Sequence, residues 1–294
     1  MEENWYHKFI GLVPGVEFRY PEENCFEFKS EDGTRLHTYK YPVENPKATA
    51  VLLHGLGAHS NYLGYLAHLL TLHKVQVYAF DYKGFGKSDG KKFQIYDFHE
   101  LIRDSQNFVN LVASHNPGQK IFLGGHSMGG AIAAYLSVSL ELNIEGLVMT
   151  SPAFRENPPV RWWKKKFLSA LRLVLPWLGV GGKKQMIRNA DAYDYIDSDP
   201  YMQHDGISTR TVCAILYGFE FISNHVHLID CPCLMVQGSD DDVTDPVFAK
   251  QMYERIKVKD KTLMWIENLG HSVCLEHEAH SILNQVSDWV QERI

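Results

Sequence analysis

The sequence has few cysteines, no excess of basic residues and no tract of low complexity. Its 294 residues include only five cysteines, at positions 25, 213, 231, 233 and 274. This odd and widely spread set fits neither a disulfide-stapled domain nor the paired knuckles of a zinc site. Lysine and arginine total 29 against 35 aspartates and glutamates, a formal net charge of −6. We therefore expect no nucleic-acid partner and reduced thiols.

Long apolar runs are also missing. The longest apolar stretch, residues 167–182, is shorter than a bilayer span and contains Arg172. The acidic opening, residues 1–5, lacks the apolar segment of a secretory signal. Hydrophobic residues make up 45% and charged residues 22% of the chain, as is usual for globular proteins. These features predict a cytoplasmic globular protein.

Short apolar runs alternate with longer helical patterns along most of the chain. The runs predicted as strands are residues 50–53, 75–80, 120–123, 144–149, 233–237 and 262–266. The patterns predicted as helices are residues 61–73, 97–114, 128–140, 245–256 and 276–294. Continuous apolar strands separated by helices are typical of a doubly wound, mostly parallel α/β sheet covered on both faces. Residues 25–29 and 35–41 are predicted to add antiparallel edge strands.

Residues 154–227 interrupt this alternation. The segment is too long for a bare loop between two strands of a compact domain, and it contains its own helical patterns. We expect it to form a helical cap over one end of the sheet. The core would then consist of residues 1–153 and 228–294.

A glycine-rich turn at the end of one predicted strand suggests a nucleophile. Residues 125–129 read Gly-His-Ser-Met-Gly, between an apolar run and an alanine-rich helix. A nucleophile elbow of this kind strains the serine backbone and needs small neighbours, here Gly125 and Gly129. Ser127 is then the candidate nucleophile, and the Met128 amide at the helix N-terminus one oxyanion donor. The alternative is a turn in which Ser127 only caps the helix.

A nucleophilic serine needs a base and an acid that orients the base. In hydrolases with this elbow, the chain order is Ser, Asp, His. His271 follows the last predicted strand and should reach the same sheet end as Ser127, because both follow the C-termini of strands. The acid should come from the loop after residues 233–237, which offers Asp240, Asp241 and Asp242. A solvated acidic turn is the alternative.

Two further loops follow predicted strands at the same end of the sheet. Residues 54–57 read His-Gly-Leu-Gly, whose glycines would let the Leu56 amide serve as the second oxyanion donor. Without a nucleophile nearby, this stretch would be only a flexible turn. Asp81 opens a glycine-rich loop and is assigned a structural role. Asp245 precedes Pro246, as expected of a helix N-cap.

As a set, several of these segments resemble the α/β-hydrolase superfamily, and within it the monoacylglycerol lipase and lysophospholipase-like group. The matching stretches are residues 54–57, 81–90, 125–130, 151–153, 238–246 and 269–271. The resemblance implies that Asp241 is the acid. It also implies a cap that shields an acyl tunnel, a small lipid or ester substrate, and no metal or organic cofactor. Gly55, Tyr62 and Tyr195 are the candidate substrate-binding residues.

The chain departs from the group's pattern at three positions. Ala58 stands where the group typically has Glu, Tyr62 or a neighbour where it has Arg, and Cys274 where a polar residue is common after the histidine. We therefore predict ester hydrolysis with loose recognition of the glycerol head group. The alternatives are a lysophospholipase, a thioesterase, a general carboxylesterase, an aryl-ester or carbon–carbon bond hydrolase, and a hydrolase-fold receptor without turnover.

Residues 161–178 form an amphipathic pattern within the predicted cap. Trp163, Phe167, Ala170, Val174 and Leu178 fall on one helical face, and Arg161, Lys165 and Arg172 fall on the other. An apolar face bordered by cations suits peripheral contact with a membrane surface. The same pattern also suits a helix that packs over the substrate pocket.

Overall fold

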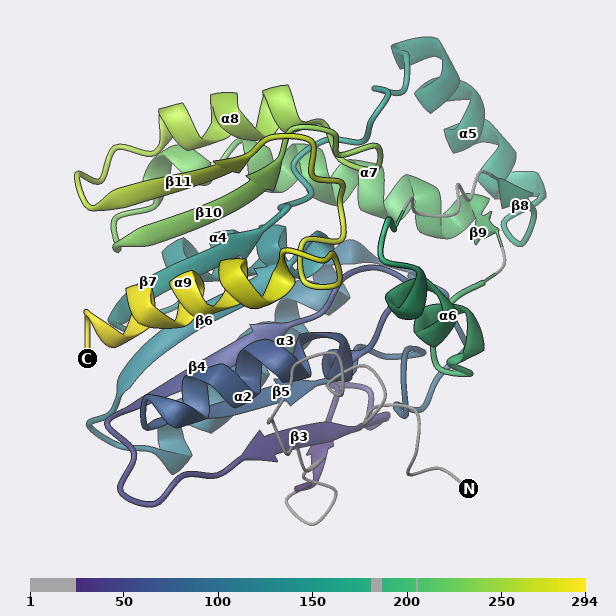
Figure 1. The fold of residues 1–294 in the computed structure, drawn as a ribbon. Coiled ribbons are helices and arrows are strands. Elements are labelled where there is room, and N and C mark those ends of the chain that lie inside the picture. Colours follow the sequence, from purple (N-terminus) through teal and green to yellow (C-terminus); the bar gives the residue numbers. More distant parts are fainter. Residues whose placement is uncertain (1–24, 181–186, 205) are drawn as a thin grey trace.

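A seven-stranded sheet organises the computed structural model, which describes residues 25–180, 187–204 and 206–294 (Figure 1). Its strand order is β11-β10-β7-β6-β4-β5-β3. The strands are β3 (Thr38–Tyr41), β4 (Ala48–Leu53), β5 (Val75–Phe80), β6 (Lys120–His126), β7 (Ile144–Thr150), β10 (Cys233–Gly238) and β11 (Lys261–Ile266). All neighbours are parallel except β3 and β5. The predicted doubly wound, mostly parallel sheet is confirmed.

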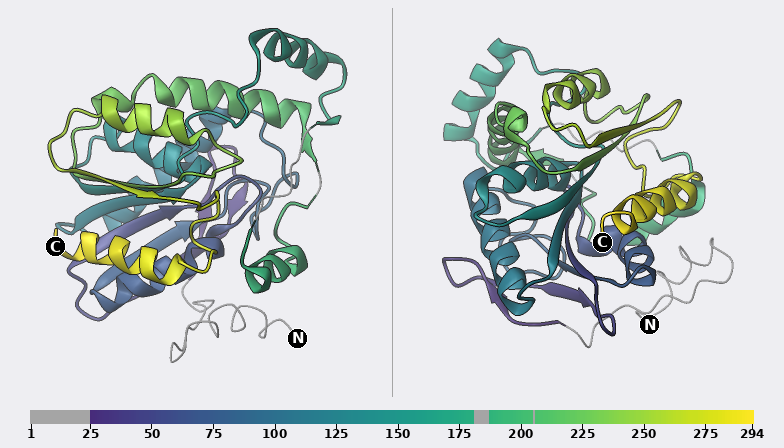
Figure 2. Two further views of the ribbon diagram at one scale, coloured as in Figure 1. Left: turned by 45° about the horizontal axis from the view of Figure 1, so that its top comes forward. Right: turned by 90° about the vertical axis from the view of Figure 1, so that its left-hand side faces the viewer.

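Helices cover both faces of this sheet, as the right-hand view of Figure 2 shows. The helices on one face are α3 (Phe98–His115), α4 (Met128–Ser139) and α8 (Pro246–Arg255). The helices on the other face are α2 (Gly64–Leu72), which follows the short 3-10 helix η2 (Ser60–Leu63), and α9 (Ala279–Gln291). Asp245 caps α8 by accepting a hydrogen bond from the Phe248 amide at 2.9 Å, which confirms its predicted role.

The central strands are buried on both faces, which explains why they read as continuous apolar runs. In β4, Val51 and Leu53 pack into the core on the α3–α4 side, whereas Ala50 and Leu52 pack on the α2–α9 side. Fully burying a valine or leucine side chain contributes roughly 1.5–3 kcal/mol. Both layers are therefore anchored to the strands that carry the site described below.

The N-terminal strands differ from the sequence-based expectation. Strand β3 is the predicted antiparallel edge strand, but β1 (Phe28–Lys29) pairs only with β2 (Arg35–Leu36), in a separate two-stranded sheet. The prediction that residues 25–29 add to the edge of the main sheet is wrong. Phe28 instead packs its ring against Phe80 and Phe108, at centroid distances of 5.6 and 5.1 Å. Aromatic packing and the buried hydrogen bond from Ser30 Oγ to Asp104 Oδ1, at 2.7 Å, hold this hairpin in place of pairing with the main sheet.

Residues 154–227 lie between β7 and β10. They contain α5 (Trp162–Val174), β8 (Gly179–Val180), α6 (Ala190–Ser198), β9 (Ile207–Ser208) and α7 (Thr209–Ser223), and η3 (Val226–Leu228) ends one residue beyond them. Helix α7 packs on α3, α4 and α5, and α5 projects from the body of the molecule (Figures 1 and 2). Among the helices in the described part of the chain, none combines the length and apolarity needed to span a bilayer.

Candidate active site

Ser127 sits at a strained turn between β6 and α4. Its backbone has φ +54° and ψ −120°, a region that non-glycine residues rarely occupy. A Cβ on Gly125 would lie 2.4 Å from the Gly129 carbonyl carbon, and a Cβ on Gly129 would lie 2.1 Å from the Leu53 carbonyl oxygen. No side chain fits at either position, so the tight turn of the predicted elbow is present.

The Ser127 side chain makes a contact other than a helix cap. The residue occupies the N-cap position of α4, but its side chain makes no capping hydrogen bond there. Its Oγ lies 2.9 Å from His271 Nε2. The alternative in which Ser127 serves only to cap the helix is therefore wrong.

His271 also contacts Asp241, from the loop after β10. His271 Nδ1 lies 2.8 Å from Asp241 Oδ2. A hydrogen bond donated by Nδ1–H to the carboxylate leaves Nε2 as an acceptor, and the Ser127 hydroxyl is placed to donate to it. The exposed fractions of Ser127, His271 and Asp241 are 8%, 1% and 2%. The structure thus brings the three predicted residues into one buried chain of hydrogen bonds.

Asp241 is held by more donors than His271 alone. Its Oδ1 accepts from the amides of Val243 and Thr244 at 2.9 and 2.7 Å. Its Oδ2 accepts from Thr244 Oγ1 at 2.7 Å and from Gln237 Nε2 at 3.0 Å. Burial alone would raise the pKa of Asp241, but its interaction with His271 and the hydrogen bonds from Thr244 lower it to about 2. The carboxyl group is therefore an anion at neutral pH.

The two neighbouring aspartates face different surroundings. Asp240 is exposed and accepts a hydrogen bond from Ser239 Oγ at 2.8 Å. Asp242 is only partly buried. Among the three acidic residues of this loop, the pairing with His271 is made by Asp241.

A second strained serine supports the His271 loop. Ser151, at the end of β7, has φ +44° and is fully buried. Its Oγ donates a hydrogen bond to the His271 carbonyl oxygen at 2.9 Å. Neither this bond nor the bond from Gln237 to Asp241 was predicted from the sequence. The only sequence feature that pointed to Ser151 was its place in the 151–153 stretch that resembles the hydrolase group.

The turn after β4 lies directly beside Ser127. A Cβ on Gly55 would lie 3.3 Å from Ser127 Cβ. His54 fixes this turn, because its Nδ1–H donates to the Gly55 carbonyl at 2.8 Å and its Nε2 accepts from the Tyr82 amide at 3.1 Å. Burial lowers the pKa of His54 to about 4, so the ring is neutral at pH 7. Leu56, the second predicted oxyanion donor, follows Gly55 in this turn.

The other predicted donor, the amide of Met128, follows Ser127 directly in the chain. Met128 is the first residue of α4. Its N–H is therefore one of the first-turn donors that an α-helix leaves without an internal acceptor. The helix dipole adds partial positive charge at the same place. The Met128 amide therefore has the local features that the prediction requires of an oxyanion donor.

Asp81 links the chain just after the turn of residues 54–57 to β3 and to its own loop. Its Oδ1 accepts from the Ser60 amide at 2.8 Å, and its Oδ2 accepts from Tyr39 Oη and the Lys87 amide, both at 2.9 Å. The side chain is fully buried. The predicted structural role of Asp81 is confirmed.

The three departures from the hydrolase pattern lie together. Ala58, Tyr62 and Cys274 are all buried in the apolar cluster beneath α2 and α9. The Tyr62 ring stacks on His126 at a centroid distance of 5.0 Å, and its hydroxyl lies 3.4 Å from His126 Nε2. Burial raises the pKa of Cys274 to about 12. Tyr62 therefore contacts the residue that precedes Ser127. The side chain of Tyr195, another predicted substrate-binding residue, lies outside the described part of the structure.

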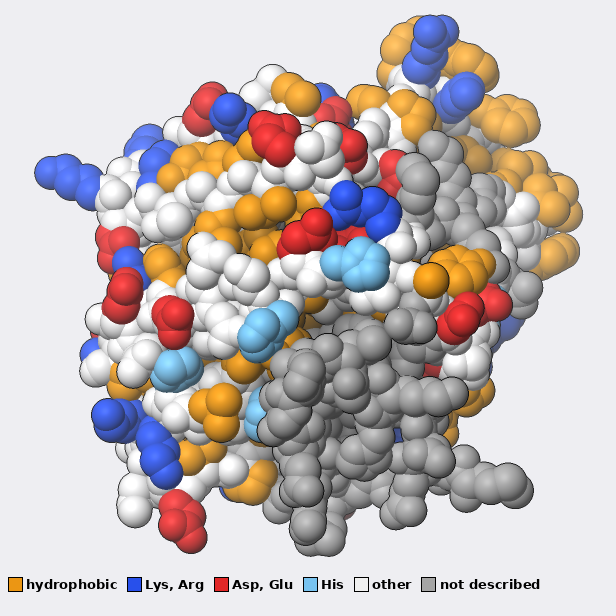
Figure 3. All heavy atoms as spheres, in the orientation of Figure 1, with side chains coloured by type: hydrophobic (Ala, Val, Ile, Leu, Met, Phe, Trp, Pro, Cys, Tyr) orange, Lys and Arg blue, Asp and Glu red, His pale blue; other side chains and the backbone are white. Residues whose placement is uncertain are grey.

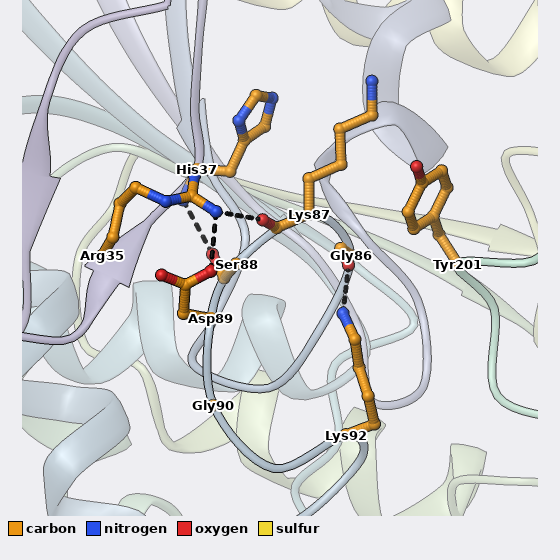
Figure 4. Close-up of a pocket in the computed structure, with 9 residues that line it drawn as sticks. All are labelled: Arg35, His37, Gly86, Lys87, Ser88, Asp89, Gly90, Lys92 and Tyr201. Atoms are coloured by element: carbon orange, nitrogen blue, oxygen red, sulfur yellow. Dashed lines mark hydrogen bonds and ion pairs between the residues drawn. The ribbon is translucent and has the colours of Figure 1, made fainter.

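The loop that begins at Asp81 lines a cavity of about 600 Å³ (Figure 4). Its lining residues are Arg35, His37, Gly86, Lys87, Ser88, Asp89, Gly90, Lys92 and Tyr201. Arg35 pairs there with Asp89 at 2.7 Å, and Lys92 donates to the Gly86 carbonyl. Ser127 is not among its lining residues. In the described part of the chain, no group of three His, Cys, Asp or Glu side chains is arranged to hold a metal ion.

Helix α5 presents its predicted apolar face to solvent. The exposed fractions of Trp163, Phe167 and Val174 are 49%, 63% and 72%. Figure 3 shows hydrophobic side chains gathered at the upper right, where Figure 1 places α5, beside side chains of Lys or Arg. The opposite side faces α7, where Lys165 pairs with Glu220. The alternative in which this apolar face packs over the pocket is therefore wrong. The helix is also shorter than the predicted pattern of residues 161–178, because it ends at Val174, two residues before Pro176.

Comparison with known proteins gives a consistent set of relatives. A family model described as serine aminopeptidase, S33, matches residues 44–278. Monoglyceride lipase from Homo sapiens is 32% identical over 279 residues, which cover 93% of this chain and 92% of the relative. A crystal structure of Paleococcus ferrophilus monoacylglycerol lipase is 28% identical, with a TM-score of 0.77, and the match covers 88% of this chain and 99% of that one.

A second solved structure matches more of this chain at lower identity. It is a soluble variant of monoglyceride lipase from Saccharomyces cerevisiae, in complex with a substrate analogue. The match has a TM-score of 0.80 and 22% identity, and it covers 95% of this chain and 96% of that one. At this identity the similarity establishes a shared fold.

Proposed function

Since the chain belongs to the serine aminopeptidase S33 family of α/β hydrolases and is an ester-hydrolysing serine hydrolase, we propose that its substrates are lipid esters with a single acyl chain. Monoacylglycerols are the proposed representative substrates, because the relatives at about 30% identity are named as monoglyceride lipases. We propose Ser127, His271 and Asp241 as the catalytic triad. The observation that carries this proposal is the buried pair of contacts at 2.9 and 2.8 Å.

The proposed reaction begins when Ser127 Oγ attacks the ester carbonyl. The hydroxyl proton passes to His271 Nε2, and the Asp241 carboxylate stabilises the imidazolium that forms. His271 then gives this proton to the leaving alkoxide, which departs as the alcohol. A water molecule then gives a proton to His271 Nε2 and attacks the acyl carbonyl. The bond from this carbon to Ser127 Oγ breaks, His271 returns the proton to Oγ, and the fatty acid is released.

The amides of Leu56 and Met128 are the proposed oxyanion hole. Two observations support this choice: Gly55, which precedes Leu56, approaches Ser127 in the turn held by His54, and Met128 begins α4 directly after Ser127. Donors fixed in advance need no reorganisation when negative charge develops on the carbonyl oxygen. The segment 154–227 is the proposed cap that excludes water from the acyl chain.

Loose recognition of glycerol is part of this proposal. A site that hydrogen-bonds a substrate hydroxyl rejects analogues that lack it, because its buried polar groups are then left unpaired. At the positions of the expected polar clamp, this chain has Ala58, Tyr62 and Cys274, all of them buried, and the Tyr62 ring stacks on His126. We therefore expect kcat/KM for a monoacylglycerol and for the methyl ester of the same fatty acid to agree within about tenfold. A preference for glycerol above about a hundredfold would contradict this part.

Peripheral binding to a membrane is the second part of the proposal. Several large apolar side chains of α5 are exposed: Trp162, Trp163, Phe167, Leu173 and Val174. Lys164 and Lys166 lie beside the two tryptophan rings, at 5.5 and 5.1 Å from their centroids. Tryptophans bordered by cations suit an anionic lipid surface, where ester substrates are found.

Co-sedimentation with anionic vesicles at low salt tests the membrane contact. Phe167→Ser, at 63% exposure, should weaken binding, whereas Leu72→Ser, at 64% exposure on α2, should leave it unchanged. Equal binding by both variants would remove α5 as the contact.

Fluorophosphonate labelling tests the hydrolase mechanism. Folded protein should be labelled at Ser127, and Ser127→Ala should lose both the label and ester turnover. A folded protein that hydrolyses esters with Ser127 absent would overturn the proposed triad.

A further inference from the structure

A segment of the inserted region is docked on the turn that carries the Leu56 amide. Asp199, just after α6, pairs with His59, just after that turn: His59 Nε2–H donates to Asp199 Oδ2 at 2.8 Å. The side chains are 5% and 0% exposed. A hydrogen bond buried to this degree, between residues 140 positions apart, fixes two chain segments against each other.

A second bond joins the same two segments through their backbones. The Gln203 amide donates to the Gly57 carbonyl oxygen at 2.8 Å. Gly57 has φ +74°, and a Cβ at this position would lie 3.1 Å from Gln203 Cβ. Asp199 also shapes residues 199–204, because its Oδ1 accepts from the Tyr201 amide and its carbonyl accepts from His204 Nε2, at 2.8 and 2.9 Å.

His59 is enclosed from its other side by the loop after β5. A Cβ on Gly86 would lie 2.8 Å from His59 Cβ and 2.1 Å from Asp81 Oδ2, so the loop approaches to contact distance. The Lys87 ammonium group lies 5.7 Å from the centroid of the Tyr201 ring, across the cavity of Figure 4. The His59 ring can therefore move little unless its hydrogen bond to Asp199 breaks first.

We propose that His59 and Asp199 are positioning residues for the oxyanion turn, a role that rests on the proposed function. Their hydrogen bond, together with that between Gln203 and Gly57, holds residues 55–59 so that the Leu56 amide stays beside Ser127. The oxyanion hole is then complete only when residues 199–204 are docked on this turn. Neither side chain contacts the reacting atoms, so the loss of their bond acts through the geometry of the turn.

The test compares Asp199→Ala with Asp199→Asn. We expect Asp199→Ala to lower kcat by about 10- to 100-fold with little change in KM, because a displacement of about 1 Å in a catalytic group can cost about a hundredfold. Asp199→Asn keeps an acceptor oxygen of the same reach and should recover most of the activity. The inhibition constant of an alkylboronic acid, whose tetrahedral adduct occupies the oxyanion position, should rise by the same factor as kcat/KM falls.

Asp104→Ala is the matched control. Asp104 is equally buried, at 1% exposure, and bonds Ser30 of another segment at 2.7 Å, far along the chain from the turn. Both alanine variants should lower the melting temperature, but Asp104→Ala should keep kcat and boronate affinity within about threefold. If Asp199→Ala does not fold, Gly57→Ala disturbs the same junction and should give the same pattern of effects.

The outcomes separate this inference from the proposed function. If Ser127→Ala is inactive while Asp199→Ala keeps its kcat and boronate affinity and loses only thermal stability, His59 and Asp199 are structural and the inference fails. If Ser127→Ala remains active, the proposed triad itself fails.

Discussion

His271 Nε2 lies 2.9 Å from Ser127 Oγ, although 144 positions separate the two residues in the chain. The contact exists because β6 and β11 are parallel, so that the loops after their C-termini lie at the same end of the sheet. Hydrogen-bonded groups of this kind act as one unit in catalysis, so the effects of removing them do not add.

Ser127→Ala and His271→Ala should each abolish ester turnover, and the double variant should lose little more. Each single change already removes the activated nucleophile, so the second has nothing left to remove. Steady-state rates of the three variants against a short-chain ester measure this. Losses that multiply in the double variant would show that the two residues act independently.

Asp241→Asn should lose less activity than Ser127→Ala, because the base and the oxyanion donors remain. Asp240→Asn and Asp242→Asn should stay within about a few-fold of the wild type, since neither is the partner of His271. These three isosteric variants are controls for one another. A large loss in Asp242→Asn together with an active Asp241→Asn would contradict the assignment of the acid.

Substitutions of Ser151 separate its hydrogen bond from its backbone strain. Ser151→Ala removes the donor to the His271 carbonyl and keeps a Cβ at φ +44°. Ser151→Gly removes the donor but relieves the strain. We expect kcat to fall by a similar factor, about tenfold, in both variants, and the glycine variant to be the more thermally stable. Unchanged kcat in both would mean that the bond does not orient His271.

The elbow should tolerate no side chain at Gly129. The added methyl group of Gly129→Ala would lie 2.1 Å from the Leu53 carbonyl oxygen, a backbone atom that cannot rotate away. We expect a loss of about 3 kcal/mol or more in the free energy of unfolding, measured in urea, together with loss of activity. Gly179→Ala, where nothing lies within 4 Å, is the control and should be nearly neutral.

His54 should make the fold less stable in mild acid. Burial lowers its pKa from 6.5 to about 4, so between these values the unfolded chain binds a proton that the folded chain refuses. The free energy of unfolding should therefore fall as the pH falls from 6.5 to 4, by up to about 3 kcal/mol from this residue. His54→Gln removes this titration and should show a shallower decline. Parallel curves for wild type and variant would contradict the prediction.

The sequence was most informative where the interactions are local. The apolar runs located β5 and β10 almost to the residue, and the glycines of residues 125–129 pointed to the tight turn at Ser127. Composition and spacing did not choose between Asp240, Asp241 and Asp242. That choice needed the resemblance to a family, because it depends on which carboxylate faces a loop 30 positions away.

The supporting contacts were out of reach for the same reason. The bonds of Asp199 to His59 and of Ser151 to His271 join residues 140 and 120 positions apart, and no local pattern marks either pair. The outward orientation of the apolar side of α5 was equally open, since burial and lipid contact favour the same spacing.

The position of β11 determines how the protein loses its activity on heating. It is the last strand of the order, it is less buried than β10, and the loop behind it carries His271. Edge elements open in excursions that require less free energy than global unfolding, and amide hydrogen exchange detects these openings. On heating, turnover should therefore cease while the far-ultraviolet dichroism of the sheet and helices is still native. Enzyme activity then reports on the opening of β11 and not on global unfolding.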